Sequence, residues 1–163
     1  ERVDYVLGSK VTGCTVADGK VVSVTVGTAG AGKEIKADAI VLAGGGFESG
    51  ALKLDSHGHL HETILDLPVT MPEGVKEEDL IHGDYWGSPQ PLFLCGVEVD
   101  ETMLVTYQGK PVHSNVYAAG GVIAGATRWQ EKSGEGIALG SAIKAADAIL
   151  SSVGAGAATK ERN

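Results

Sequence analysis

The chain has 163 residues, and its 24 glycines make about one residue in seven glycine, roughly twice the usual share. It has no Gly-X-Y repeat and only 5 prolines, which excludes collagen-like and proline-rich disordered chains. The formal charge of −8, from 13 basic and 21 acidic side chains, offers no basic surface for nucleic acid or an anionic membrane. With 43% hydrophobic and only 5% aromatic residues, the sequence predicts a folded domain with an aliphatic core.

Residues 1–37 predict a small antiparallel β-meander. Two valine-rich runs flank Asp18-Gly19, a dipeptide whose residues both tolerate the positive φ of a tight hairpin turn. We expect a loop over residues 27–33 and a short third strand over residues 34–37.

Residues 38–46 predict a buried strand that ends in glycine. The continuous apolar run over residues 39–43 is typical of a strand buried on both faces, and it stops at Gly44-Gly45-Gly46. From residue 47 to residue 95 the periodicity is lost and four of the five prolines occur. We expect an irregular excursion there, with a short helix near residues 77–81.

Residues 96–153 predict closing strands and a helix, which complete one domain over residues 1–153. Alternating strands over residues 96–100 and 103–105 precede a second buried strand over residues 116–121 that ends in Gly-Gly. A helix is predicted over residues 136–150, and residues 154–163 predict a flexible tail. The helix has two faces: polar Ser141, Lys144, Asp147 and Ser151, and apolar Leu139, Ile143, Ala146 and Leu150.

Membrane and metal functions are not expected. The longest apolar runs, residues 39–47 and 116–126, are too short to span a bilayer, so no direct membrane insertion is predicted. The three histidines of residues 57–61 are interpreted as a polar surface loop rather than a metal site. Cys14 and Cys95 predict reduced thiols of a cytoplasmic protein.

Glycines gather at the ends of the two buried strands and around the start of the helix. Small residues at these positions let a flat or phosphorylated ligand approach the backbone. The predicted cofactor-binding residues are Ala43, Gly44, Gly45, Gly46, Gly120, Gly121, Gly134, Glu135 and Gly136.

Two segments carry a family resemblance. Residues 37–47, Ala-Asp-Ala-Ile-Val-Leu-Ala-Gly-Gly-Gly-Phe, resemble the strand and Leu-Ala-Thr-Gly-Gly-type motif of the fumarate reductase and succinate dehydrogenase flavoprotein superfamily. Residues 115–121, Asn-Val-Tyr-Ala-Ala-Gly-Gly, are similar to the Leu-Tyr-Ala-Ala-Gly-Asp/Glu motif that closes the same flavin-binding domain. The chain also resembles the B-subunit family of anaerobic glycerol-3-phosphate dehydrogenases, on Gly45–Gly50, Ile64–Val69, His82–Trp86 and Pro89–Pro91.

The resemblance implies an α/β fold with α+β character, a Rossmann-like FAD/NAD(P)-binding domain of which this chain is the C-terminal part. It implies FAD or FMN in the intact protein and oxidation of glycerol 3-phosphate to dihydroxyacetone phosphate. Electrons would pass to quinone through partner subunits, a catalytic flavoprotein and an iron–sulfur membrane anchor at the inner face of the cell membrane. The alternatives are a fumarate reductase-like or other FAD-dependent dehydrogenase, and a non-catalytic assembly subunit that has lost its cofactor.

The sequence departs from the family pattern in ways that weaken cofactor binding. Gly44 replaces the usual threonine, Gly121 replaces an acidic residue, and no Gly-x-Gly-x-x-Gly precedes the meander to cradle a pyrophosphate. Since the chain begins at Glu1 without an initiator methionine, we expect it to be part of a longer polypeptide. By itself it is predicted to bind no flavin, to be inactive, and to self-associate or exchange strands through unpaired sheet edges.

Two catalytic residues are predicted. Arg128 lies between the second glycine-ended strand and the helix, where its paired donors suit a substrate phosphate; a surface arginine is the alternative. His82 would accept the hydroxyl proton of the substrate, although the spacing does not favour it over His113. By the resemblance the helix start points at the flavin, and Glu135 would oppose a phosphate there, which favours the pyrimidine edge of the ring. Alternatively, Glu135 interacts only with the helix dipole.

Overall fold

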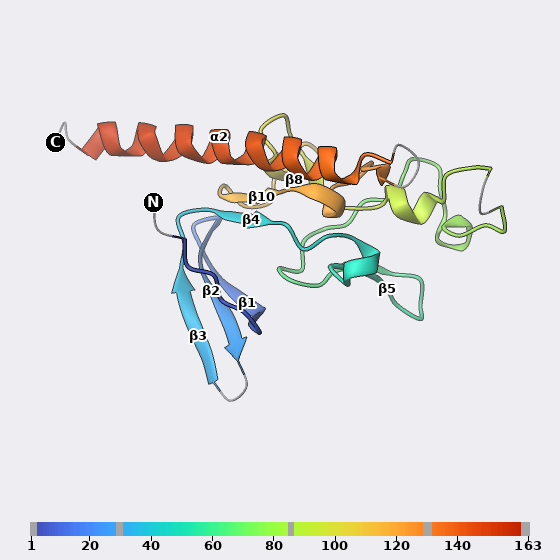
Figure 1. Cartoon of the computed structure of the whole chain (residues 1–163), viewed down its shortest axis with the longest axis horizontal. Helices are drawn as coiled ribbons and strands as arrows, with labels where there is room; N and C mark the ends of the chain where they lie inside the picture. The colour runs from blue at the N-terminus through green and yellow to red at the C-terminus, as the bar shows by residue number, and fades with distance from the viewer. Residues whose placement is uncertain (1–2, 29–30, 85–86, 129–131, 161–163) are drawn as a thin grey trace.

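The computed structural model describes residues 3–28, 31–84, 87–128 and 132–160, which form several small sheets and one long C-terminal helix. The helix α2 (Gly134–Lys160) runs along one side of the molecule, and the meander of the first three strands projects on the other (Figure 1). The strands β4 (Ile40–Leu42) and β10 (Val116–Ala118) lie between them (Figure 1). The predicted mixture of strands and helix is confirmed at this level.

The meander consists of β1 (Lys10–Ala17), β2 (Lys20–Thr28) and β3 (Ala31–Lys36), paired antiparallel in that order. The hairpin prediction is confirmed, because Asp18 and Gly19 form the turn with φ of 50° and 72°. The predicted loop over residues 27–33 is wrong: β2 and β3 stay paired as far as Thr28 and Ala31. Glycines 27 and 32 face each other in this ladder, which depends on backbone hydrogen bonds rather than on side chains.

The two glycine-ended strands pair in parallel, with Ile40 opposite Val116 and Leu42 opposite Ala118. β10 is buried along its whole length, as predicted. For β4 the prediction of burial on both faces is wrong, since Val41 is 42% exposed. Among the residues that the structure describes, β4 pairs with β10 alone, so no strand pairs with its second edge, and Val41 is covered only in part.

One buried amide joins the meander to β10. Asn115 Oδ1 accepts a hydrogen bond from Val21 N–H at 2.9 Å, and Asn115 Nδ2 donates to the carbonyl oxygens of Val21 and Asp38 at 2.7 and 3.0 Å. The side chain therefore satisfies three backbone groups where the meander meets the parallel strands.

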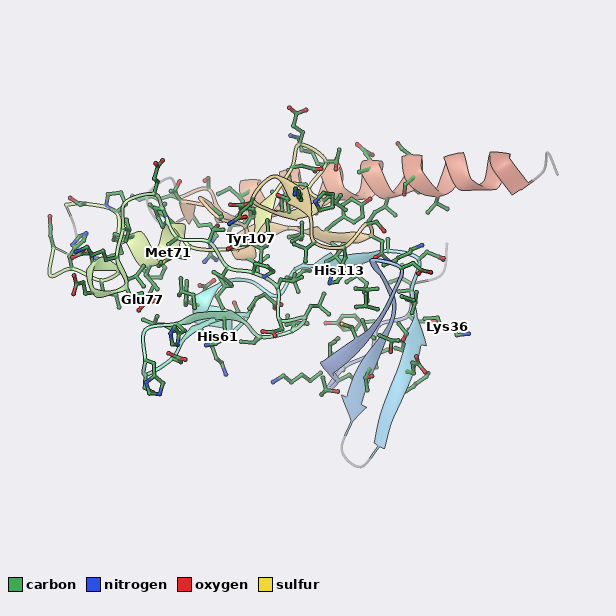
Figure 2. The ribbon with its side chains drawn as sticks, turned by 180° about the vertical axis from the view of Figure 1, so that it is seen from behind. Lys36, His61, Met71, Glu77, Tyr107 and His113 are labelled. Atoms are coloured by element: carbon green, nitrogen blue, oxygen red, sulfur yellow. The ribbon has the colours of Figure 1, made fainter. Side chains whose placement is uncertain are left out.

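The excursion contains more regular structure than the sequence predicts. The short helix expected near residues 77–81 is confirmed as the 3-10 turn η2 (Glu77–Asp79), and Figure 2 places Glu77 at the opposite end of the molecule from Lys36 on the meander. The hairpin of β5 (Leu52–Leu54) and β6 (Leu60–Glu62) has no counterpart among the elements predicted from the sequence. Two further 3-10 turns are η1 (Phe47–Ser49) and η3 (Pro91–Leu94).

The tip of the β5–β6 hairpin carries the histidine run. His59 and His61 are both exposed, as predicted, but only His59 lies in the loop, because His61 belongs to β6. Their rings approach one carboxylate oxygen of Asp55, with His59 Nδ1 at 3.4 Å and His61 Nε2 at 3.1 Å. At the base of the hairpin, the buried carboxylate of Glu62 accepts the backbone N–H groups of residues 64, 65 and 67 and so holds the following loop.

A fourth small sheet is formed by β7 (Glu98–Val99), β8 (Val105–Tyr107) and β9 (Lys110–Pro111). Its residues join the core with β10 and the 3-10 turn η4 (Gly120–Val122). The core is aliphatic, as the composition predicts, and its buried members are Val21, Leu42, Leu52, Leu65, Leu67, Val97, Val105, Val116, Ala118 and Val122.

The helix is longer than predicted at both ends. α2 begins at Gly134 instead of residue 136 and continues to Lys160, so the predicted tail of residues 154–163 is helical as far as residue 160; residues 161–163 lie outside the described part. The alanines of this segment favour helix, which offsets the cost of its two glycines. By length and composition, Gly134–Val153 would be able to cross a membrane, a feature that the two shorter apolar runs did not reveal.

The packed face of α2 is not its aliphatic face. The helix contacts η4 and β10 and buries Ser141 and Ala145, which are 8% and 0% exposed. The aliphatic stripe of the amphipathic pattern points away from the domain, and Leu139 and Leu150 are 64% and 70% exposed. The small side chains on the packed face let the helix approach the glycine-ended strand closely.

Candidate functional site

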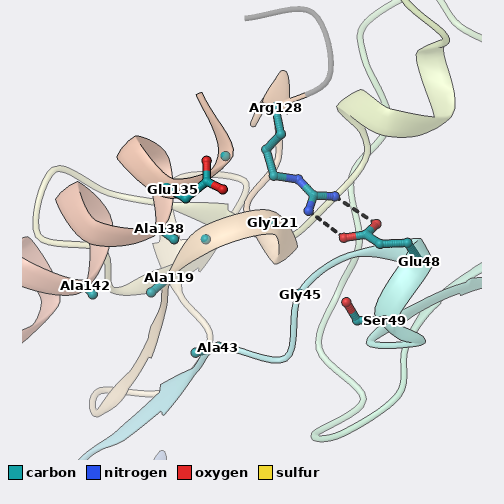
Figure 3. A pocket seen from close by; sticks show the side chains of 12 residues that line it. Ala43, Gly45, Glu48, Ser49, Ala119, Gly121, Arg128, Glu135, Ala138 and Ala142 are labelled. Carbon is teal, nitrogen blue, oxygen red and sulfur yellow. Dashed lines mark hydrogen bonds and ion pairs between the residues drawn. The ribbon is translucent and has the colours of Figure 1, made fainter. Parts of the chain in front are cut away.

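The ends of β4 and β10 and the start of α2 surround a pocket of about 550 Å³ (Figure 3). Because the two strands are parallel and in register, their glycine-rich ends meet at the same edge of the sheet, where α/β proteins bind ligands. Its lining residues are small except for three charged side chains, and they are Ala43, Gly45, Glu48, Ser49, Ala119, Gly120, Gly121, Arg128, Gly134, Glu135, Ala138 and Ala142.

The structure brings together six of the nine predicted cofactor-binding residues. Lining the pocket are Ala43, Gly45, Gly120, Gly121, Gly134 and Glu135. Gly45 and Gly120 have φ of 81° and 74°, a conformation that side chains other than glycine rarely adopt. These glycines therefore allow the chain to turn and place no side chain at the pocket wall.

The other three predicted glycines lie elsewhere. A Cβ on Gly44 would stand 2.8 Å from Ile64 Cδ1, so this glycine allows the strand end to pack against the excursion. Gly46 lies behind the side chain of Arg128, and a Cβ there would stand 2.8 Å from Arg128 Nη2. Gly136 lines a different cavity of about 440 Å³ on the other side of α2, together with Lys144.

The two predicted catalytic residues are separated. Arg128 lines the pocket, whereas His82 does not. His82 is held within the excursion: its backbone N–H donates to Gln90 Oε1 at 2.9 Å, and its ring Nε2 lies 3.3 Å from the carbonyl oxygen of Pro89. The alternative histidine, His113, also lies outside the pocket lining; its buried Nδ1 has no hydrogen-bond partner among the residues that the structure describes.

Arg128 forms a bidentate ion pair with Glu48. Arg128 Nη1 donates to Glu48 Oε1 at 2.5 Å and Nη2 donates to Oε2 at 2.9 Å (Figure 3). The hydrogen bonds from Arg128 lower the pKa of Glu48 from 4.5 to about 2, although partial burial of the carboxylate acts in the opposite direction. Hydrogen bonding to Glu48 in turn raises the pKa of Arg128.

Glu48 belongs to the site although the sequence did not single it out. It stands in Gly45–Gly50, a segment that carries the family resemblance, but its partner is 80 residues away in the sequence. The signal in the sequence is that a carboxylate, Glu48, and a cation, Arg128, are the first charged residues after the two glycine-ended strands. The alanines of α2 were missed as well, because only the helix direction shows that Ala138 and Ala142 line the same pocket as Glu135.

The N–H group of Gly120 is already used. It donates to Ser141 Oγ at 2.9 Å, and Ser141 Oγ donates in turn to the carbonyl oxygen of Ile137 at 2.6 Å. This chain of hydrogen bonds ties the end of β10 to the second turn of α2. Ser141 thus holds the two walls of the pocket together.

Comparison with known proteins identifies the relatives of this chain. Residues 1–137 match the FAD binding domain family. The chain is 31% identical over 122 residues to the B subunit of the anaerobic glycerol-3-phosphate dehydrogenase of Haemophilus influenzae (strain PittEE), a match that covers 72% of this chain and 27% of the relative. The proteins of the same name from Glaesserella parasuis serovar 5 (strain SH0165) and Yersinia pestis bv. Antiqua (strain Antiqua) are 30% and 32% identical, over 71% and 72% of this chain and 27% and 26% of theirs. No solved structure matches the chain significantly.

Proposed function

Because this chain belongs to the FAD binding domain family, we propose that the pocket between β4, β10 and α2 contacts the flavin of a glycerol-3-phosphate dehydrogenase. The observation that supports this most directly is the convergence of glycine-rich ends from three separate segments on one pocket. A flavin supplies the chemistry that amino acids lack, since it accepts the hydride of an alcohol carbon.

The lining residues suit the uncharged part of a flavin. Gly45, Gly120 and Gly121 present backbone without side chains, and Ala119 and Ala138 are small and apolar, so a flat ring system meets no steric barrier. The sequence has no Gly-x-Gly-x-x-Gly motif, the element that cradles a pyrophosphate with its backbone N–H groups. We therefore infer that these residues hold the ring or the ribityl chain, and that this chain alone retains neither FAD nor FMN.

We also propose that β4 and β10 belong to a larger Rossmann-like parallel sheet. Parallel sheets occur almost only where helices cover both faces, yet Val41 of β4 is 42% exposed. The matched region covers only 27% of the Haemophilus influenzae relative, so a strand beside β4 and a helix over Val41 have room in the remainder.

The reaction that we propose rests on the name of the relatives. The name of the relatives supports glycerol 3-phosphate as the substrate and dihydroxyacetone phosphate as the product. The role of His82 as proton acceptor stays a prediction from the sequence. Because these relatives are named as one subunit of a larger enzyme, we propose further subunits as well: a catalytic flavoprotein and an iron–sulfur anchor that passes electrons to quinone at the inner face of the membrane.

The test is the visible absorbance of the complete natural protein, purified with its co-purifying subunits. Flavin that is bleached by glycerol 3-phosphate supports the proposal, and acid extraction with mass spectrometry distinguishes FAD from FMN. Bleaching by succinate or another donor alone would indicate a different dehydrogenase. Absence of flavin would indicate a non-catalytic assembly subunit and would overturn the cofactor assignment.

Two alanines on α2 give a matched pair of variants for the same test. Ala138→Leu fills the pocket, and we expect it to lower the flavin content of the purified protein. Ala146→Leu adds the same volume to an exposed position of the same helix outside the pocket, and we expect it to leave the flavin content unchanged. Equal flavin content in the two variants would place the cofactor elsewhere.

A further inference from the structure

We propose that Glu48 is a specificity-determining residue: by neutralising Arg128 at the wall of the pocket, it makes the pocket reject a phosphate group and accept an uncharged part of a ligand. The proposal deepens the cofactor assignment and rests on it for the identity of that ligand. It also implies that Arg128 does not make the substrate-phosphate contact that its residue type suggests.

The paired donors of Arg128 are already engaged. An arginine binds phosphate best through two parallel N–H groups of its planar fork, and in this structure Nη1 and Nη2 both donate to the carboxylate of Glu48. Glu48 remains ionised well into the acid range, because the hydrogen bonds from Arg128 lower its pKa to about 2. A phosphate would have to displace a carboxylate that is covalently part of the pocket wall.

The guanidinium of Arg128 occupies space that is free only because residues 46 and 121 are glycines. A Cβ on Gly121 would stand 2.6 Å from Arg128 Cζ, and a Cβ on Gly46 would stand 2.8 Å from Arg128 Nη2. The group therefore lies between the backbones that follow β10 and β4. These glycines, one of which replaces the acidic residue of the family motif, provide the space that the ion pair occupies.

The charges of the lining residues agree with this selectivity. One cation, Arg128, faces two carboxylates, Glu48 and Glu135, and Glu135 stands in the first turn of α2 where an anion would otherwise be favoured. The pocket as a whole does not attract a phosphate, although it contains an arginine and a helix start.

The experiment measures binding of inorganic phosphate to the 163-residue chain by phosphorus NMR and by the phosphate-dependent shift of the melting temperature, with chloride at equal ionic strength as the reference. We expect the unmodified chain to bind phosphate weakly, and Glu48→Gln, which frees the guanidinium, to bind it about tenfold more tightly. Arg128→Gln in the Glu48→Gln background should abolish the gain.

Two variants control for net charge and for folding. Glu135→Gln removes a carboxylate of the same pocket that makes no pair with Arg128 in the described structure, and we expect no comparable gain. The exchange Glu48→Arg with Arg128→Glu restores a pair in the opposite order, so it should fold if Glu48→Gln alone does not, and it should bind phosphate as weakly as the unmodified chain.

Two results would overturn the proposal. One is tight phosphate binding by the unmodified chain that Arg128→Gln removes, which would make Arg128 a free anion contact. The other is no gain in Glu48→Gln despite a folded protein. The assay needs no flavin, so a complete natural protein without flavin would reject the cofactor assignment and leave the phosphate result standing.

Discussion

β4 and β10 have nearly the same sequence pattern, an apolar run followed by glycines, but they differ in how deeply their side chains are buried. In β10, Val116 and Ala118 are 0% exposed and Tyr117 is 6% exposed. In β4, Leu42 is 4% exposed but Val41 is 42% exposed. β10 has neighbours on both edges: β4 on one, and on the other the chain at Met103, whose carbonyl oxygen accepts the N–H group of Ala118 at 2.9 Å.

If the sheet continues beyond β4, as we propose, an apolar run indicates how deeply a strand is buried in the complete sheet and not in one part of it. β10 contacts β4, the segment before β8, and α2, all of which belong to this chain. Among the described residues, β4 has a paired strand on one edge only. The exposed side chain of Val41 therefore marks the face over which we propose a helix, and the unpaired second edge of β4 marks where we propose that the sheet continues.

The largest expected effect separates the two strands directly. Val116→Asp places an unpaired carboxylate in the core, and we expect it to cost more than about 4 kcal/mol and to abolish cooperative unfolding. Val41→Asp meets solvent and should cost less than about 1 kcal/mol. Urea denaturation followed by circular dichroism measures both, and a similar cost for the two would contradict the asymmetry.

The second prediction concerns the amide that begins β10. Asn115→Ala leaves the backbone groups of Val21 without a partner, and we expect it to cost about 2–4 kcal/mol. Hydrogen exchange adds a local readout, because the amide of Val21 should lose protection while that of Ala118 keeps it. Unchanged protection at Val21 would show that the meander docks without this side chain.

The third prediction tests which face of α2 covers β10. Ala145→Leu overpacks a site that is 0% exposed, and we expect it to cost about 1–3 kcal/mol. Leu150→Ala removes a larger side chain from a site that is 70% exposed and should change the stability by no more than about 0.5 kcal/mol. The reverse order in thermal denaturation would mean that the helix packs through its aliphatic stripe.

The smallest effect belongs to the ion pair that joins the segments after β4 and β10. Since the pKa of Glu48 is lowered from 4.5 to about 2, its contribution is complete above about pH 4.5 and is lost as the pH falls through about 2. The Glu48 side chain is 49% exposed, so we expect the ion pair to contribute at most about 1 kcal/mol. The stability gap to Glu48→Gln, measured by urea denaturation, should shrink between about pH 6 and about pH 2; a constant gap would exclude the pairing.

Much of the local structure follows from short-range rules. The Asp18-Gly19 turn is predictable because its two residues need nothing beyond their own backbone preferences. The β5–β6 hairpin was missed because its strands are three residues long and depend on the buried Glu62 carboxylate, which organises the loop after them. Likewise, residues 27–28 pair with residues 31–32 as strands, although a glycine-rich stretch indicates a loop.

For the candidate site, too, some features follow from residue type and others from the tertiary structure. The sequence by itself determined which residues are small enough to line a cofactor pocket, since glycine and alanine carry that property wherever they lie. Only the tertiary structure decided which of them share one pocket: register brings Gly45 and Gly121 together, and the direction of α2 adds Ala138 while turning Gly136 to the other side. The charge of the pocket was decided there too, because an ion pair across 80 residues depends on where two loops meet and not on any spacing along the chain.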